Sequence, residues 1–281
     1  MVQDSSQWKI DTQGNKKPNP WKLCTVTQVE ETKLILRVLP IWLSCLMFGM
    51  ALTQGNSLFV KQGSTMDRSL GFHFLVPPAS LLAISTISGL VFVTIYDRCM
   101  VPVARRITGN ERGITVLQRI GIGMFFSVLS MVTAALIEKK RIHVAKSHDL
   151  LDSPRSVIPL SVFWLAPQFV LMGIACVFTL VGMQEYFYDQ VPDSMRSLGI
   201  ALSESVLGIA SFLGSLVITI VERASKGRWF GSNLNRSKLD YFYWLLAILS
   251  AINLCCFVYM TRIYTYKKVV KQIISDKTNS S

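Results

Sequence analysis

The stretch SVIPLSVFWLAPQFVLMGIACVFTLVGMQ, residues 156–184, decides the fold, because its 29 residues include no Asp, Glu, Lys or Arg. An α-helix needs roughly 20 mostly apolar residues to cross a bilayer. Four further stretches lack charged residues and one has a single acid, Glu204; they are residues 38–60, 69–96, 120–137, 241–261 and 197–221. Inside lipid each backbone amide must be hydrogen-bonded within its own segment, so the six stretches are predicted to be helices.

The predicted architecture is an all-α membrane protein with six transmembrane helices, at about 34–55, 74–96, 116–138, 158–187, 197–221 and 241–264. The composition agrees, with 51% hydrophobic and only 16% charged residues, whereas soluble domains carry about a quarter charged residues. Six apolar stretches of this length exclude an ordinary soluble enzyme, a disordered chain and a disulfide-rich secreted domain. A transmembrane β-barrel is disfavoured, because barrel strands alternate over about ten residues.

The net charge of +12 comes from 29 Lys and Arg against 17 Asp and Glu. These cations lie between the apolar stretches, where they meet lipid head groups and water, so we expect a bilayer and not nucleic acid as partner. The six cysteines show no CxxC spacing and lie in or beside apolar stretches. Neither a metal site, a cofactor nor a disulfide framework is expected, and residues 1–20 lack the apolar core of a signal peptide.

The distribution of Lys and Arg gives the orientation. With a cytoplasmic N-terminus, the inside segments carry 14 such residues and the outside segments 12, and three arginines near inside helix ends raise the inside total to 17. The positive-inside rule therefore favours both termini in the cytoplasm. Asn235-Arg236-Ser237 has the pattern of an N-glycosylation acceptor on a predicted outside loop, which is compatible with this orientation.

Short motifs recur in a fixed order along the chain. The segment after the second predicted helix reads Tyr96-Asp97-Arg98, then Arg105-Arg106 and Thr108-Gly109, and ends in Leu117-Gln118-Arg119-Ile120-Gly121. Other motifs are Leu39-Pro40-Ile41-Trp42, Pro77-Pro78-Ala79-Ser80, Glu185-Tyr186-Phe187-Tyr188-Asp189-Gln190 and Leu239 to Trp244. In this order and spacing the chain resembles the plant nitrate/peptide transporter family, the plant branch of the proton-dependent oligopeptide transporters in the major facilitator superfamily.

In that family these motifs belong to the last six helices of a twelve-helix transporter. The resemblance therefore implies the C-terminal half of a major facilitator fold, with a central-linker remnant at 1–33, a six-helix lobe at 34–264 and a cytoplasmic tail at 265–281. The N-terminal six helices are expected to be missing. The family's Glu-x-x-Glu-Arg proton-coupling motif belongs to that half, and no such motif occurs here.

The resemblance also implies gating residues. It assigns Asp97, Arg98, Arg105 and Arg106 to the superfamily's loop motif, in which an acid contacts a neighbouring helix end and arginines clamp the closed cytoplasmic gate; we group Arg196 with them. Anchoring by the positive-inside rule alone remains the alternative.

Candidate residues of the solute pathway are the polar side chains at membrane depth. Glu204 is expected to contact protons or substrate in a cavity, or else to be a protonated or cavity-facing acid beside Ser203 and Ser205. Gln54, Asn56 and Gln168 are expected to line a central cavity, with interhelical hydrogen bonding as the alternative. By alignment with the family, Leu52 replaces the histidine that binds nitrate and Cys176 replaces the acid that holds a peptide's amino terminus.

Other residues at helix ends have simpler interpretations. Trp42, Trp164 and Trp244 are expected to anchor the helices at the membrane interface. His73, His143 and His148 are expected to be solvated. The prolines at 40, 77, 78, 159 and 167 mark either hinges that line a cavity or tolerated kinks.

The function expected from the resemblance is proton-coupled uptake of nitrate, a peptide or another small organic solute across the plasma or vacuolar membrane. The alternative is a non-transporting membrane protein, inert or regulatory, that associates with full-length relatives. No nucleophile elbow, phosphate-binding loop or zinc spacing is found in the sequence, so an enzyme is not expected.

Overall fold

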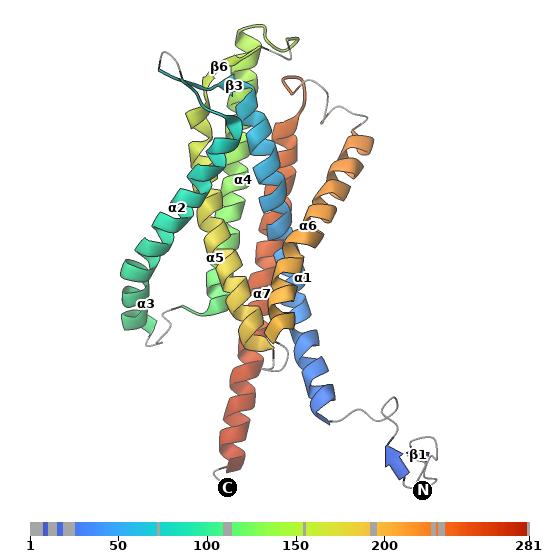
Figure 1. Cartoon of the computed structure of the whole chain (residues 1–281). Coiled ribbons are helices and arrows are strands. Elements are labelled where there is room, and N and C mark those ends of the chain that lie inside the picture. Colours follow the sequence, from blue (N-terminus) through green and yellow to red (C-terminus); the bar gives the residue numbers. More distant parts are fainter. Residues whose placement is uncertain are drawn as a thin grey trace.

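The structure is a computed structural model that describes residues 8–10, 16–18, 26–71, 74–108, 114–153, 156–191, 196–225, 229 and 234–279. Six helical segments in these ranges are long and apolar enough to cross a membrane, which confirms the predicted architecture. The spans run up and down, so the start of the first and the end of the last lie at the same end of the bundle (Figure 1). We call this the N/C end and the opposite one the far end.

The spans are built from seven α-helices: α1 Val26–Ser64, α2 Leu82–Ile95, α3 Val101–Thr108, α4 Val116–Ser147, α5 Ala166–Gln190, α6 Arg196–Ala224 and α7 Leu239–Asn279. The 3-10 turns η2 (Pro78–Leu81) and η4 (Val162–Leu165) precede α2 and α5, and the π-helical turn η3 (Tyr96–Met100) joins α2 to α3. Short strands pair as β1 (Trp8–Ile10) with β2 (Lys16–Pro18), β3 (Met66–Asp67) with β6 (Ile158–Ser161), and β4 (Ser69–Leu70) with β5 (Phe74–Leu75).

The helix ends differ from the prediction. α1 and α4 each continue nine residues beyond the predicted ends at 55 and 138, and α7 runs on without a break through 265–279. Residues 97–108, predicted to be part of a loop, are helical. Lys, Arg and Glu are good helix formers, so α4 and α7 continue after their uncharged stretches have ended at 137 and 261, whereas α1 continues first through the rest of its own uncharged stretch, 38–60. Conversely, 74–77 and 158–161 are extended and not part of a span.

Most of the prolines stand at helix starts. Pro77 precedes η2, Pro78 is its first residue, and Pro167 lies in the first turn of α5, where the missing N–H would have had no helical partner. Pro159 lies in strand β6. Of the prolines considered as hinges, only Pro40 lies inside a helix, and its carbonyl accepts a hydrogen bond from the Ser44 hydroxyl at 3.0 Å.

A capping box formed by Thr115 and Gln118 sets the start of helix α4. The Thr115 hydroxyl accepts a hydrogen bond from the Gln118 N–H, and the Gln118 side chain accepts one from the Thr115 N–H. This reciprocal cap satisfies two N–H groups that the first turn leaves free. It fixes the start of the helix that carries Arg119.

Glycines allow the closest helix contacts. A Cβ built on Gly173 of α5 would overlap the carbonyl oxygen of Ser85 on α2, and one on Gly123 of α4 would lie 2.8 Å from the backbone nitrogen of Thr179 on α5. Between helices in a membrane there is no hydrophobic driving force, so association depends on close packing, and small residues let the helix backbones approach closely. These contacts place α5 between α2 and α4.

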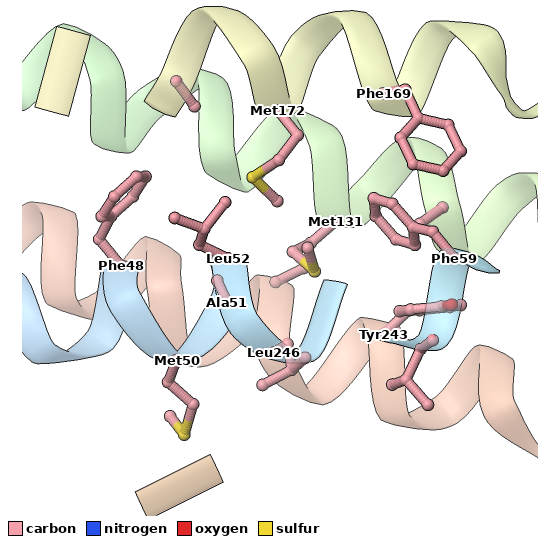
Figure 2. Close-up of a cluster of buried hydrophobic side chains, with 14 of the residues drawn as sticks. Phe48, Met50, Ala51, Leu52, Phe59, Met131, Phe169, Met172, Tyr243 and Leu246 are labelled. Atoms are coloured by element: carbon pink, nitrogen blue, oxygen red, sulfur yellow. The ribbon is translucent and has the colours of Figure 1, made fainter. Parts of the chain in front are cut away.

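A single large cluster of apolar side chains forms the core between α1, α4, α5 and α7. Figure 2 shows Leu52 of α1 facing Met131 and Met172, and Phe59 between Phe169 and Tyr243. The ring centres of Phe59 and Phe169 are 5.4 Å apart, edge to face, and those of Phe59 and Tyr243 5.7 Å. The core thus fills the middle of the described bundle.

Burial is uneven among the spans. In the most apolar segment of each span, 61% of α1, 56% of α5 and 50% of α4 is buried inside the bundle, against 17% for both α2 and α6. Figure 1 shows α2 and α6 at the two flanks. The surfaces of these two helices are therefore covered by lipid, water or protein that does not come from the described part of the chain.

Candidate functional site

The exposed surface of α6 has two different sides. One stripe of exposed residues at helical spacing is small or polar; it consists of Ser197, Ala201, Glu204, Gly208, Ser211, Ser215, Thr219 and Glu222. Beside it lies an apolar side, with Phe212 80% exposed and Leu216 and Ile220 more than half exposed. Hydrocarbon suits the apolar side, whereas polar groups in a span face water or protein. We call the first set the polar stripe.

Glu204 lies on the polar stripe, two turns into α6, and is exposed. Gln184 of α5 donates a hydrogen bond from Nε2 to the Glu204 carboxylate at 3.0 Å. The Ser203 and Ser205 hydroxyls, which the sequence offered as partners for Glu204, donate instead to the backbone carbonyls of Ile200 and Leu202. The carboxylate is therefore held by the neighbouring helix and not by its sequence neighbours.

Trp42 fixes the same turn of α6 from the other side. Its indole N–H donates to the Leu202 carbonyl at 3.0 Å and to the Ser205 hydroxyl at 3.1 Å. A side chain bound in this way crosslinks α1 to α6, and anchoring of Trp42 at the membrane interface stays a prediction. Trp164 and Trp244 are exposed, and the Lys140 ammonium stacks 3.2 Å from the Trp164 ring centre.

Gln54 and Asn56 occupy the second half of α1. Gln54 is 8% exposed, and its amide fills the space that a side chain at Gly214 of α6 would need. Asn56 is half-buried. Gln54 thus packs at the α1–α6 contact, beside the polar stripe.

Gln168 lies in an interhelical network and not on a cavity. It is fully buried, its Nε2 donates to Gln62 Oε1 of α1 at 3.2 Å, and its backbone carbonyl accepts from the Ser130 hydroxyl of α4 at 2.8 Å. Of the two alternatives considered for Gln168, a cavity or an interhelical hydrogen bond, the structure shows the second. Gln62 Nε2 and Gln168 Oε1 have no partner in this network.

Cys176 is half-buried in α5 against the core, and no disulfide is found among the described cysteines. No group of three or more His, Cys, Asp or Glu side chains in the described ranges could hold a metal ion. His143 and His148 are exposed, in keeping with solvation, and His73 lies outside the described residues.

The predicted gating residues lie at the N/C end. Asp97 and Arg98 belong to the π-helical turn η3, and Arg105 and Arg106 to α3; all four are exposed. Within the described residues they form no hydrogen bond or ion pair. They are therefore free to meet groups from outside the described residues. Arg196, at the start of α6, is also exposed, and its guanidinium lies 4.7 Å from the Tyr188 ring centre.

Arg119 connects three helices close to η3. Its guanidinium lies 5.3 Å from the ring centre of Tyr96, the first residue of η3, and 5.9 Å from that of Phe178. It also pairs with Glu185 of α5 at 3.5 Å. A π-helical turn often marks a functional position, and Arg119 holds its first residue against α4 and α5.

The sequence interpretation missed a charged cluster at the far end. Arg141 and Glu138 of α4 are both 0% exposed and form a two-pronged ion pair, Nη2 to Oε1 at 2.6 Å and Nε to Oε2 at 2.8 Å. Arg141 also donates to Thr65 Oγ1, Asn235 Oδ1 and the Leu234 carbonyl at 2.9–3.1 Å. The Glu-x-x-Arg spacing could have indicated this pair, because residues three apart are neighbours on a helix.

Asn235 is part of this cluster and is 2% exposed. Its amide nitrogen donates to the carbonyls of Leu150 and Ser153, and its oxygen accepts from Arg141. The folded lobe has no room for a glycan at this position. The sequon at Asn235 is therefore a structural asparagine, and it gives no support for the orientation.

Comparisons with known proteins agree on one family. The family model described as "POT family" (PTR2) matches residues 4–233. Among curated proteins of Arabidopsis thaliana, Protein NRT1/ PTR FAMILY 5.4 is 50% identical over 258 residues, which are 91% of this chain and 46% of that protein. Protein NRT1/ PTR FAMILY 5.7 is 55% identical over 259 residues, 90% of this chain and 42% of that protein.

Solved structures share the fold at low sequence identity. The crystal structure of an auto-inhibited POT family peptide transporter matches with a TM-score of 0.67 and 18% identity, over 83% of this chain and 42% of that one. The POT family transporter PepTSo matches with a TM-score of 0.65 and 18% identity, over 88% and 45%. The chain spans about half the length of the relatives that it matches.

Proposed function

The chain belongs to the POT family, and from this premise we propose that it is one six-helix lobe of a proton-coupled membrane transporter. The observation that carries the proposal is the polar stripe of α6, which lies on a span only 17% buried. A row of serines and a glutamate does not suit hydrocarbon. A second lobe, in the same polypeptide or a separate one, would cover part of this surface and leave a water-filled path for solute.

The gating residues support the same arrangement. Asp97, Arg98, Arg105 and Arg106 are exposed and have no partner among the described residues. Ion pairs with a facing lobe would form when the path is closed at the N/C end and break when it opens. Exposed pairs contribute at most about 1 kcal/mol each, so several weak pairs suit a gate that must open again. Arg196 at the start of α6 would join them.

We propose that the N/C end faces the cytoplasm. Arg141 was counted among the outside loop charges, but it is buried in α4, so the outside total falls from 12 to 11, against 17 inside. This strengthens the positive-inside argument. Residues 1–33 and 265–281, which precede and follow the lobe in the sequence, are then both cytoplasmic.

For the solute path we propose Glu204 and Gln54, which lie on or beside the polar stripe, and Asn56, which is half-buried in α1. Gln168 is buried, and we assign it to helix packing. Cys176 lies half-buried on α5, and its neutral thiol supplies no charge for a substrate. The solute class is a small anion such as nitrate, a short peptide, or another small organic molecule.

The test joins this chain to the N-terminal half of its 50% identical Arabidopsis relative and measures uptake of nitrate and of a dipeptide into liposomes. We expect uptake that a proton gradient drives and an uncoupler abolishes, and none by the chain alone. Uptake by the lone chain would contradict the need for a second lobe. A folded chimera that takes up neither probe, while the chain co-purifies with a full-length relative, would favour a regulatory, non-transporting role.

A further inference from the structure

Glu204 is a carboxylate in a membrane-spanning helix, and the described part of the chain offers it no cation. The span that carries it is long and apolar enough to cross a membrane. Its one hydrogen bond comes from Gln184, and no Lys, Arg or His among the described residues lies within ion-pair distance. Ionisable groups within spans are costly, and they mark ion or substrate pathways with an identifiable partner.

The charged groups of the packed helices do not compensate this charge. On α6, Arg196 lies two turns earlier, with its guanidinium over the Tyr188 ring. On α5, Glu185 pairs with Arg119, and Asp189 is a further acid. On α1, residues 38–60 include no charged side chain. The nearby charges of α5 thus add acids and not bases.

The space next to Glu204 is open. Gly208 follows by one helical turn on the same stripe, and apart from its chain neighbours and the nearby backbone of α6 itself no heavy atom lies within 4 Å of a Cβ built there. At Gly199 and Gly214 of the same helix, by contrast, a Cβ would collide with Phe187 and Gln54. Glycine inside a helix costs about 1 kcal/mol relative to alanine, and at Gly208 helix packing within the lobe does not explain that cost.

The carboxylate is also held in place. Trp42 binds the turn 202–205 from α1, and Gln184 binds one carboxylate oxygen from α5. Because Gln184 donates through its amide nitrogen, its own Oε1 remains an acceptor. The second Glu204 oxygen and this amide oxygen are acceptors, which suit a donor-rich cation. Gly208 lies one helical turn along the same stripe.

We propose that Glu204, Gln184 and the open surface at Gly208 bind the cationic group, an ammonium or guanidinium, of a small solute that moves along the polar stripe. This inference rests on the proposed function, because it requires water along that stripe. It adds a substrate class: a solute that carries a positive charge.

The test uses the chimera described above, this chain joined to the N-terminal half of its 50% identical Arabidopsis relative, in liposomes, with the six cysteines of this chain and any in the added half replaced and Gly208→Cys added. Rates of thiol modification are measured with a cationic and an anionic methanethiosulfonate reagent of similar size. We expect the cationic reagent to react faster, and Glu204→Gln to lower the ratio of the two rates by about tenfold. Ethylammonium or guanidinium should slow the reaction, whereas neutral acetamide should not. Glu204→Asp should keep most of the ratio.

Two matched variants separate this inference from the proposed function. Ser215→Cys lies on the polar stripe farther from Glu204, and Phe212→Cys lies on the apolar side. We expect the first to react without regard to charge and the second to be protected by lipid. If stripe cysteines react but Glu204→Gln leaves the ratio unchanged, the cation site is wrong and the polar path stands. If neither stripe cysteine reacts, both are wrong.

Discussion

Replacing Arg141 with methionine should destabilise the lobe more than any other single charge removal at the far end. The guanidinium makes five hydrogen bonds to four partners, two of them to the buried carboxylate of Glu138. Methionine fills much of the same space but leaves that carboxylate buried without a partner. Removing one member of a buried ion pair costs about 3–5 kcal/mol.

The three neutral partners contribute less. Interhelical hydrogen bonds in membrane proteins average about 0.6 kcal/mol, so Thr65, Asn235 and the Leu234 carbonyl together account for about 2 kcal/mol. The double variant Glu138→Leu with Arg141→Met removes both charges and loses only this smaller part. It should therefore be more stable than Arg141→Met alone, although one more native residue has been replaced.

The assay is thermal unfolding of the chain in detergent micelles, followed by tryptophan fluorescence. At about 2–4 °C per kcal/mol for a chain of this size, Arg141→Met should lower Tm by roughly 6–20 °C. Lys139→Met, an exposed neighbour on α4, is the matched control and should change Tm little. The reasoning is refuted if the two single variants shift Tm equally, or if adding Glu138→Leu lowers the stability of Arg141→Met further.

Three other predictions, which use four substitutions, have defined outcomes. Gly173→Ala places a methyl group on the Ser85 carbonyl oxygen and should lower Tm and the folded yield, whereas Gly208→Ala, which meets no atom, should leave Tm unchanged or raise it. Trp42→Phe loses two hydrogen bonds to α6 and should cost about 1–2 kcal/mol in the same unfolding assay. Hydrogen bonds from the Ser69 hydroxyl and N–H lower the pKa of Asp67. A lowered carboxyl pKa contributes stability to the folded state at pH values above the ordinary aspartate pKa of about 3.9, and this contribution is lost only as the pH falls below that value. Asp67→Asn should therefore not alter how Tm depends on pH between about 5 and 8.

The number of spans was predictable because uncharged stretches of this length have few other structures available in lipid. The ends of the spans were not predictable, because a hydropathy pattern shows where the first charged residue stands, whereas the helix can continue beyond that residue. α4 shows the difference: Glu138 was taken as the end of a span and Arg141 as a loop cation, yet both lie in the helix and face the core. A count of loop charges cannot tell a buried arginine from a solvated one.

The direction of a side chain was less predictable than its depth. In a helix that is apolar on all sides, periodicity does not single out an inward face. Both a cavity and an interhelical hydrogen bond therefore stayed open for Gln168, which bonds Gln62 inside the bundle. α6 is different, because its small and polar residues recur on one side. The stripe that includes Glu204 could have been identified from sequence spacing alone.

The two ends of the lobe satisfy their charges differently, and this difference separates structure from function. At the far end Arg141 is buried and its partners all come from this chain, so the charge serves the fold. At the N/C end Asp97, Arg98 and Arg105 have no partner among the described residues, and Glu204 has no cation. A span gains nothing in stability from a charge without a counter-charge. For these charges we have proposed partners outside the described residues, a facing lobe for the first three and a solute for the last.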